Sequence, residues 1–161
     1  QEGAQLKWED VDFKSRTLTI KDTKNREPHT LPLSDYLVKL LKNRSKNKIP
    51  DNPYVFPGNG EKTKHLIEPK KQLQKVIQVS GIHFTLHDLR RTFISIAESL
   101  DIPYYALKKL ANHKMGGDVT AGYIVNDAER LRKPMQMITD KMLTEAGRKT
   151  PAKVIKLQKG V

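Results

Sequence analysis

Residues 11–33, VDFKSRTLTIKDTKNREPHTLPL, set the fold class. Leu, Thr and Ile, which favour strands, alternate here with polar residues, as they do in half-buried strands. The alternation is broken by DTKNREP, residues 22–28, which is rich in charged and turn-forming residues. The segment therefore predicts a small antiparallel sheet with a basic turn.

On the C-terminal side of this segment the pattern becomes helical. Ser34 is a good N-cap for residues 35–46, in which Tyr36, Leu37, Leu40 and Leu41 fall on one face. Residues 46–60 contain several Pro and Gly breaks, so they predict an irregular connection around a short strand at residues 54–56.

A second helical stretch is predicted from Lys64 to Gly81. Its expected buried face consists of Leu66, Leu73, Val76 and Ile77. The next start signal is TLHD, residues 85–88, in which the Thr85 hydroxyl and the Asp88 carboxylate can each accept from a first-turn amide, forming a capping box. Further helices are expected at residues 86–100, 103–110, around 119–125 and 127–145.

These elements indicate an α+β class, mainly helical, with a small antiparallel sheet near the N-terminal end. With 161 residues and 37% hydrophobic content, the chain can bury one sizeable core. We expect one domain over residues 1–146 and a basic tail over residues 147–161, whose VIKL patch (154–157) could dock on a neighbouring protomer.

The charge balance points to a polyanionic partner. Thirty Lys and Arg against 18 Asp and Glu leave a formal charge of +12, which favours nucleic acid, although ribosomal, chromatin and membrane-surface proteins share this balance. The absence of cysteine excludes disulfides, thiolate zinc sites and cysteine nucleophiles. No apolar run approaches the about 18 to 20 residues that span a bilayer, so no membrane association and a cytoplasmic location are expected.

The first chemical motif is HDLRR, residues 87–91. His87 and Arg90 are three residues apart and Arg91 is one turn from His87, so the three side chains can share a helix face. An Arg fork, a His donor and helix N-terminal amides can together bind a phosphate. Taken alone, such a motif is more typical of an ordinary basic helix, with one packed His and two solvated Arg, than of a phosphate site.

A second motif lies downstream in LANHKMGGDVTAGYIV, residues 110–125. His113 ends a short helix, and Tyr123 follows ten residues later across a Gly-Gly break. The order HxxRR, Leu-x-x-His and Tyr resembles the motif set of the tyrosine recombinases, the phage-integrase family. The TKN turn and the Asp-Val-Thr-x-x-Tyr stretch resemble prophage or genomic-island enzymes.

Other features agree with this resemblance. Lys24 stands eight residues before Pro32, like the turn lysine of the family, with Lys21 as the second choice. Glu2, Leu6 and Trp8 resemble the end of the family's first motif, whose Arg would stand two positions before Gln1; we therefore expect the chain to be a fragment, truncated at its N-terminus. Asn112 replaces the usual Gly before the histidine, and Asn is the residue best able to adopt the same left-handed backbone.

The resemblance implies transesterification at DNA phosphates through a 3′-phosphotyrosyl intermediate. Tyr123 would be the nucleophile, Lys24 the general acid, Arg90 and His113 the phosphate ligands, and His87 an aid to positioning or proton removal. It implies double-stranded DNA as partner and a homotetramer on that DNA. The motifs contain no Asp or Glu cluster suited to two-metal phosphoryl chemistry, so no metal or other cofactor is expected. The residues expected to contact the DNA without reacting are Arg91, Lys21, Arg26 and Lys114.

Three other functions are compatible with the same residues. The cations could hold phosphates in a DNA-binding module without catalysis, or serve a type IB topoisomerase-like strand cleavage, or belong to a basic structural protein. The remaining aromatic and imidazole groups have ordinary interpretations: Tyr104 is expected to pack, and His29 to lie on the surface or cap a helix.

Overall fold

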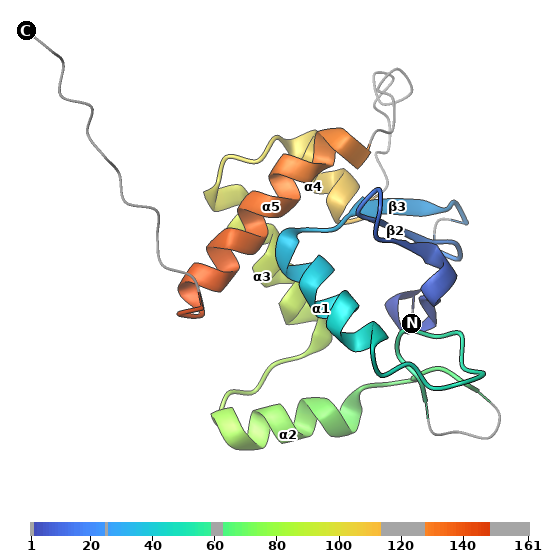
Figure 1. Ribbon diagram of the computed structural model, residues 1–161. Helices are drawn as coiled ribbons and strands as arrows, with labels where there is room; N and C mark the ends of the chain where they lie inside the picture. The colour runs from blue at the N-terminus through green and yellow to red at the C-terminus, as the bar shows by residue number, and fades with distance from the viewer. Residues whose placement is uncertain (1, 25, 59–62, 114–127, 149–161) are drawn as a thin grey trace, which may run out of the picture.

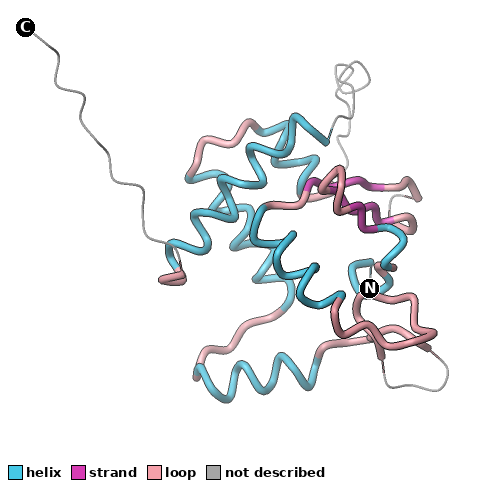
Figure 2. Tube along the Cα trace, viewed as in Figure 1, coloured by secondary structure: helices cyan, strands magenta, loops and turns pink. Residues whose placement is uncertain are grey.

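The structure is a computed structural model that describes residues 2–24, 26–58, 63–113 and 128–148. Within these ranges the chain forms two 3-10 helices, three short strands and five α-helices (Figure 1). The strands all lie in the first fifth of the chain, and the helices that follow make up most of the fold (Figure 2). The α+β, mainly helical class predicted from the sequence is confirmed.

The sheet is antiparallel with the order β1-β2-β3. It comprises β1 (Val11–Asp12), β2 (Thr17–Ile20) and β3 (His29–Pro32). Ile20 pairs with His29, so residues 21–28 form the connection between β2 and β3. The predicted basic turn is therefore the β2–β3 turn.

Elements that precede and follow the sheet in sequence contribute to the first core cluster. The 3-10 helices η1 (Glu2–Gln5) and η2 (Trp8–Asp10) precede the sheet, and α1 (Asp35–Ser45) follows it, with the Ser34 hydroxyl accepting from Leu37 N as predicted. Leu41 is buried, whereas Leu40, expected on the same face, is 49% exposed. The buried members of the cluster are Leu6, Val11, Leu33, Leu41 and Val55.

The strand predicted at residues 54–56 does not form. Tyr54 makes only an isolated bridge with Lys7. The segment is still fixed, because Val55 N donates to Leu6 O at 2.8 Å and the Val55 side chain is fully buried. Trp8 N also donates to Pro53 O and Leu66 N to Phe56 O, both at 2.9 Å, so a buried side chain and backbone hydrogen bonds together fix this irregular connection.

The predicted buried face of the second helix is wrong. Helix α2 (Lys70–Ser80) begins six residues later than expected and ends, as predicted, at Gly81, whose φ of 69° is left-handed. None of its residues is buried, and Val76 and Val79 are 52% and 91% exposed. Leu73 and Ile77 are half-buried, so within the described residues the apolar stripe is only partly covered.

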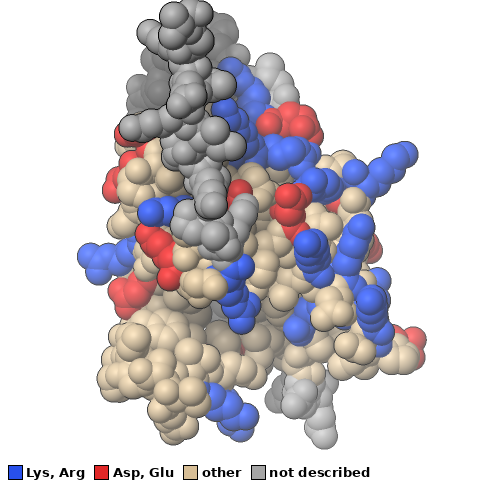
Figure 3. All heavy atoms as spheres, turned by 60° about the vertical axis from the view of Figure 1, so that its left-hand side comes forward, with Lys and Arg blue, Asp and Glu red and all other residues tan. Residues whose placement is uncertain are grey.

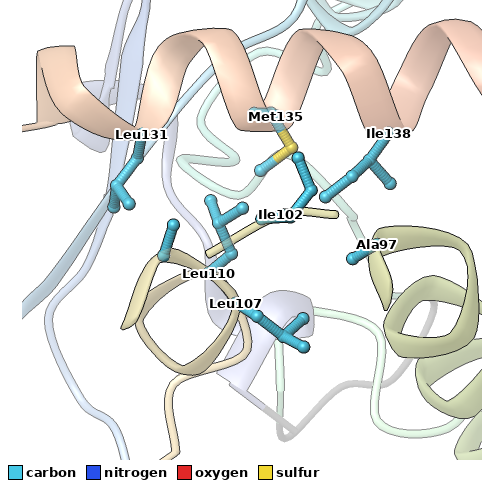
Figure 4. Packing of buried hydrophobic residues seen from close by; sticks show 8 residues of the cluster. Ala97, Ile102, Leu107, Leu110, Leu131, Met135 and Ile138 are labelled. Atoms are coloured by element: carbon cyan, nitrogen blue, oxygen red, sulfur yellow. The ribbon is translucent and has the colours of Figure 1, made fainter. Parts of the chain in front are cut away.

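The second core cluster joins the last three helices, α3 (Leu86–Ser99), α4 (Tyr104–Leu110) and α5 (Ala128–Glu145). Figure 4 shows side chains from α5 pointing toward those of α3 and α4. The buried residues are Ala97, Ile102, Ala106, Leu107, Leu110, Leu131, Met135 and Ile138. Because α5 also packs on β3, this helix links the helical frame to the sheet.

Helix α5 ends close to the predicted domain boundary. Gly147 has a φ of 66°, and Arg148 N donates to Leu143 O at 2.8 Å, which closes the helix. The helix predicted around residues 119–125 and the tail beyond residue 148 lie outside the described residues. Within the described ranges, none of the helices has the length and apolar character needed to span a bilayer.

Candidate active site

The start of α3 presents two of the predicted site residues. Asp88 N donates to the Thr85 hydroxyl at 3.3 Å, and Thr85 N donates to the Asp88 carboxylate at 2.9 Å. These bonds form the predicted capping box, and the Thr85 hydrogen bonds hold the pKa of the Asp88 carboxyl below its usual value. The cap fixes the first turn, on which His87 and Arg90 are both exposed to solvent.

Arg90 connects this turn to the end of α4. Its guanidinium donates to the backbone carbonyl of Ala111, two residues before His113. The contact brings the HxxRR and Leu-x-x-His motifs together, although they are far apart in sequence. An Arg fork beside an exposed His is an arrangement that can hold a phosphate.

The end of α4 has the backbone that the sequence predicted. Asn112 has a φ of 50°. Asn112 N donates to Lys109 O at 3.1 Å and His113 N donates to Lys108 O at 2.9 Å, which is the pairing of a Schellman motif. The left-handed residue turns the chain sharply, so His113 leaves the helix as an exposed residue next to the Arg90 contact.

Lys24 stands on the exposed β2–β3 turn. Arg26 N donates to Thr23 O at 2.8 Å, which closes the turn around Lys24. The buried Thr23 hydroxyl donates to Glu27 O at 2.8 Å, and Lys24 N donates to the Glu2 carboxylate at 2.6 Å. Hydrogen bonds from Lys24 N and from the residues that flank it thus fix the backbone of Lys24, while its side chain is exposed.

Lys21, the second choice for the same role, is held by acidic neighbours. Its ammonium lies 2.6 Å from the Asp10 carboxylate and 3.3 Å from that of Glu9. Hydrogen bonds from Lys21 to Asp10 and Glu9 raise the pKa of Lys21 above its usual value. A lysine whose pKa is raised gives up its proton less readily near neutral pH.

His29 is buried, so the prediction of a surface or capping role is wrong. It lies on β3 at 8% exposure, and its Nε2 makes no hydrogen bond within the described part of the chain. Its ring faces the backbone of Lys109 on α4; burial lowers the pKa of His29, and the Lys109 charge acts in the same direction. His29 thus joins the sheet to the helix that leads to His113.

The remaining predicted residues are not all placed. Arg91 is exposed, with its guanidinium 3.9 Å from the Asp88 carboxylate; Arg26 is exposed on the Lys24 turn. Tyr123 and Lys114 lie outside the described residues. Tyr104 is 70% exposed, so the prediction that it packs is wrong; the Lys108 ammonium lies 4.6 Å from its ring centroid.

Basic side chains gather on one part of the described surface. Figure 3 shows Lys and Arg side chains mainly over the right-hand part of the view and an uncharged area at the lower left. Among the residues that the structure places, no group of three or more His, Asp and Glu is arranged to hold a metal ion.

Two contributors to this region were not identified from the sequence as such. The Glu2 carboxylate accepts a hydrogen bond from Lys24 N. Arg132 on α5 donates to the carbonyls of Ser15 and Arg16. Both contacts join residues remote in sequence. No local pattern marks them, because an acidic residue near the start and an arginine on a helix are each ordinary.

Comparison with known proteins places the chain in a family. Residues 1–130 match the model of the phage integrase family. The chain is 31% identical over 151 residues to prophage integrase IntF of Escherichia coli K12, covering 91% of this chain and 32% of the relative. It is 31% identical over 141 residues to an integrase of Shigella phage Sf6, covering 86% and 36%.

More distant proteins agree. Tyrosine recombinase XerA of Pyrococcus furiosus is 29% identical over 115 residues, covering 70% of this chain and 40% of the relative. An integrase from mycobacterium phage Brujita has the same fold, with a TM-score of 0.66 at 21% identity over 85% of this chain and 45% of that one. The chain spans about a third of the length of the two prophage and phage relatives above. The chain belongs to the phage integrase family.

Proposed function

We propose that this chain is the catalytic part of a site-specific tyrosine recombinase, which integrates or excises DNA through a 3′-phosphotyrosyl intermediate. The contact between Arg90 and Ala111 carries the proposal, because it joins the HxxRR motif to the end of the helix that presents His113. The names of the relatives, prophage integrase and tyrosine recombinase, support it. Because the chain spans about a third of the prophage integrase, the activity is that of the intact protein.

The exposed cations can stabilise the negative charge that develops on the phosphate during the reaction. A phosphodiester is anionic, and more charge develops on its non-bridging oxygens as it is attacked. Arg90 and His113 would donate to those oxygens, which stabilises the transition state more than the ground state. The capped first turn of α3 keeps His87 and Arg90 on one face, so both can approach the same phosphate.

The bond changes are then as follows. The Tyr123 oxygen attacks phosphorus, a new O–P bond forms, and the bond from phosphorus to the 5′ oxygen breaks. The phenolic proton passes to the His87 imidazole, and the departing 5′ oxygen takes a proton from the Lys24 ammonium. A 5′ hydroxyl from another strand then attacks the phosphotyrosyl link and reverses these steps. Each step exchanges one phosphoester bond for another, so no ATP is needed.

Lys24, and not Lys21, is assigned as the general acid. A general acid is most effective when its pKa is near the working pH. The carboxylates of Asp10 and Glu9 raise the pKa of Lys21, which moves it in the wrong direction. We assign Lys21, together with Arg26, Arg91 and Lys114, to phosphate contacts that add affinity without sequence choice.

The assembly is also part of the proposal. The partner would be double-stranded DNA in the cytoplasm, bound by four copies of the protein. Residues 1–146 would form the catalytic domain, and the basic tail of residues 147–161 would dock on a neighbouring copy. Deleting residues 147–161 should weaken assembly on DNA in a mobility-shift assay; unchanged assembly would count against tail docking.

The experiment for the proposed function traps the covalent intermediate. The intact protein is incubated, in the presence of EDTA, with nicked duplexes that carry a randomised segment, and DNA joined to protein is recovered after denaturation in SDS. An adduct should form with the wild type and be absent from Tyr123→Phe. An adduct in both would contradict the assignment of Tyr123, and no adduct in either would favour a DNA-binding module. Recombination that requires two matching sites would then exclude a topoisomerase.

A further inference from the structure

Arg132 reaches from α5 across to the β1–β2 turn. Its guanidinium donates to the Ser15 carbonyl at 3.0 Å and to the Arg16 carbonyl at 3.3 Å. It also pairs with Glu129 one turn earlier, through Nε at 2.9 Å and through Nη2. The side chain is 28% exposed. A planar fork is well suited to hold two carbonyls and a carboxylate at once.

The site that Arg132 contacts is a junction of several elements. The Arg16 carbonyl also accepts from Leu33 N at 2.8 Å, at the end of β3, and the Arg16 guanidinium pairs with Asp35 at the start of α1. Arg16 itself has a left-handed φ of 54°. β2 begins at the next residue, Thr17. The contacts of Arg16 therefore fix the position of the first residues of the strand that leads to Lys24.

A second polar contact lies one turn further along α5. The Gln136 side chain accepts from Asp35 N at 2.9 Å and donates to Asp140 at 2.9 Å. The other side of α5 contacts α3 and α4 through apolar side chains such as Met135 and Ile138. Apolar packing is non-directional, whereas hydrogen bonds to a fork fix orientation. Leu31 of β3 also packs on this apolar cluster. The polar contacts therefore add a fixed orientation to the apolar packing between the sheet and the helical frame.

We propose that Arg132 is a positioning residue for Lys24. It locks the sheet, whose β2–β3 turn presents Lys24, onto the helical frame that presents His87, Arg90 and His113. The inference rests on the proposed function, in which Lys24 protonates the departing 5′ oxygen. Without the Arg132 contacts, the phosphate-binding residues on α3 and α4 would keep their positions, but the proton donor Lys24 would be misaligned.

The test uses two substrates that differ at one atom. In one nicked duplex the scissile bridging 5′ oxygen is normal, and in the other it is sulfur, which leaves as a thiolate without needing a proton. The variants are Arg132→Gln, Arg132→Lys and Lys24→Ala in the intact protein. Arg130→Gln is the matched control, because it removes the same charge from an exposed position on the same helix. Adduct formation is followed at saturating protein.

Arg132→Gln should slow adduct formation on the normal substrate by about 10- to 100-fold relative to Arg130→Gln, as expected for misplacement of a catalytic group. On the sulfur substrate the two variants should react at the same rate. Lys24→Ala should likewise be slow on the normal substrate and react at the rate of Arg130→Gln on the sulfur substrate. Arg132→Lys, which can reach one carbonyl but lacks the fork, should lie between Arg132→Gln and the wild type on the normal substrate.

Two outcomes would overturn the inference. One is an equal defect of Arg132→Gln on both substrates, and the other is no defect relative to Arg130→Gln. If Arg132→Gln does not fold, as judged by its melting temperature, Arg132→Lys decides: a wild-type rate on the normal substrate would overturn the inference. Failure of the proposed function is distinct, because the wild type would then form no adduct with either substrate.

Discussion

The guanidinium of Arg90 donates to the backbone carbonyl of Ala111. This contact ties the first turn of α3 to the end of α4, so two motifs separated by about twenty residues act as one surface. Arg90 must therefore serve two partners: a carbonyl of the protein and, in the proposed reaction, a phosphate. Only a side chain with several fixed donors can do both.

The first prediction concerns this double role. Arg90→Lys keeps the charge but cannot hold the carbonyl and two phosphate oxygens together. We expect adduct formation at saturating protein to fall by about 100-fold or more, the scale seen when one transition-state donor is removed. DNA affinity in a mobility-shift assay should change far less. Arg130→Lys is the control, and an Arg90→Lys rate equal to that of Arg130→Lys would contradict the assignment.

A second prediction concerns the left-handed residue before His113. Asn112 has a φ of 50°, a conformation that a β-branched residue adopts only at a cost of about 1 to 2 kcal/mol. Asn112→Val should lower the free energy of unfolding in urea by about that amount, whereas Asn112→Gly should leave it within about 0.5 kcal/mol of the wild type, since Gly is commonest at this helix-end position. Equal destabilisation by both substitutions would mean that backbone conformation is not what Asn112 supplies.

A third prediction separates the two lysines of the sheet. Lys24→Ala should slow adduct formation by about 100- to 10,000-fold, the usual contribution of a general acid. Lys21→Ala should leave the chemical step almost unchanged, because the carboxylates of Asp10 and Glu9 raise the pKa of Lys21 and make it a poor proton donor. It should weaken DNA binding, because a positive charge that faces the phosphates is lost. Single-turnover rates and mobility shifts, measured side by side, test both statements. The reverse pattern, with chemistry lost in Lys21→Ala, would exchange the two roles.

A fourth prediction is a pH dependence of stability. Burial lowers the pKa of His29 in the folded protein; the Lys109 charge acts in the same direction and Glu2 opposes it. The unfolded chain takes up this proton near pH 6.5. The stabilisation is therefore complete above about pH 6.5 and is lost as the pH falls from there toward the lower folded value.

The melting temperature should consequently drop more between pH 7.5 and 5.5 in the wild type than in His29→Leu. His83→Leu, which removes an exposed histidine, should behave like the wild type. Parallel pH profiles for the wild type and His29→Leu would show that His29 does not carry the effect.

Local signals in the sequence predicted the parts of the site that depend on neighbouring residues. The Thr85–Asp88 capping box and the left-handed Asn112 are decided within four residues of chain, and both are present as expected. The hairpin that carries Lys24 is similarly local, because its turn residues and strand alternation lie side by side. The capping box follows from hydrogen-bonding preferences alone. For Asn112 the family resemblance marked the position, and the backbone preference of Asn supplied the conformation.

Features that depend on distant partners could not be predicted in the same way. The periodicity of α2 indicated an apolar face but not whether another element covers it, and Val76 of that face is 52% exposed. The burial of His29 depends on its contact with Lys109, and the reach of Arg132 depends on a turn more than a hundred residues earlier. These contacts arise only when the sheet and the helices pack together.

The most direct test of the central claim is to identify the atom that joins protein to DNA. The trapped adduct is digested with nuclease and protease, and the modified peptide is sequenced by mass spectrometry. We predict a nucleotide linked through its 3′ phosphate to Tyr123, with a free 5′ hydroxyl on the other side of the break. A link to any other residue, or through a 5′ phosphate, would contradict the account.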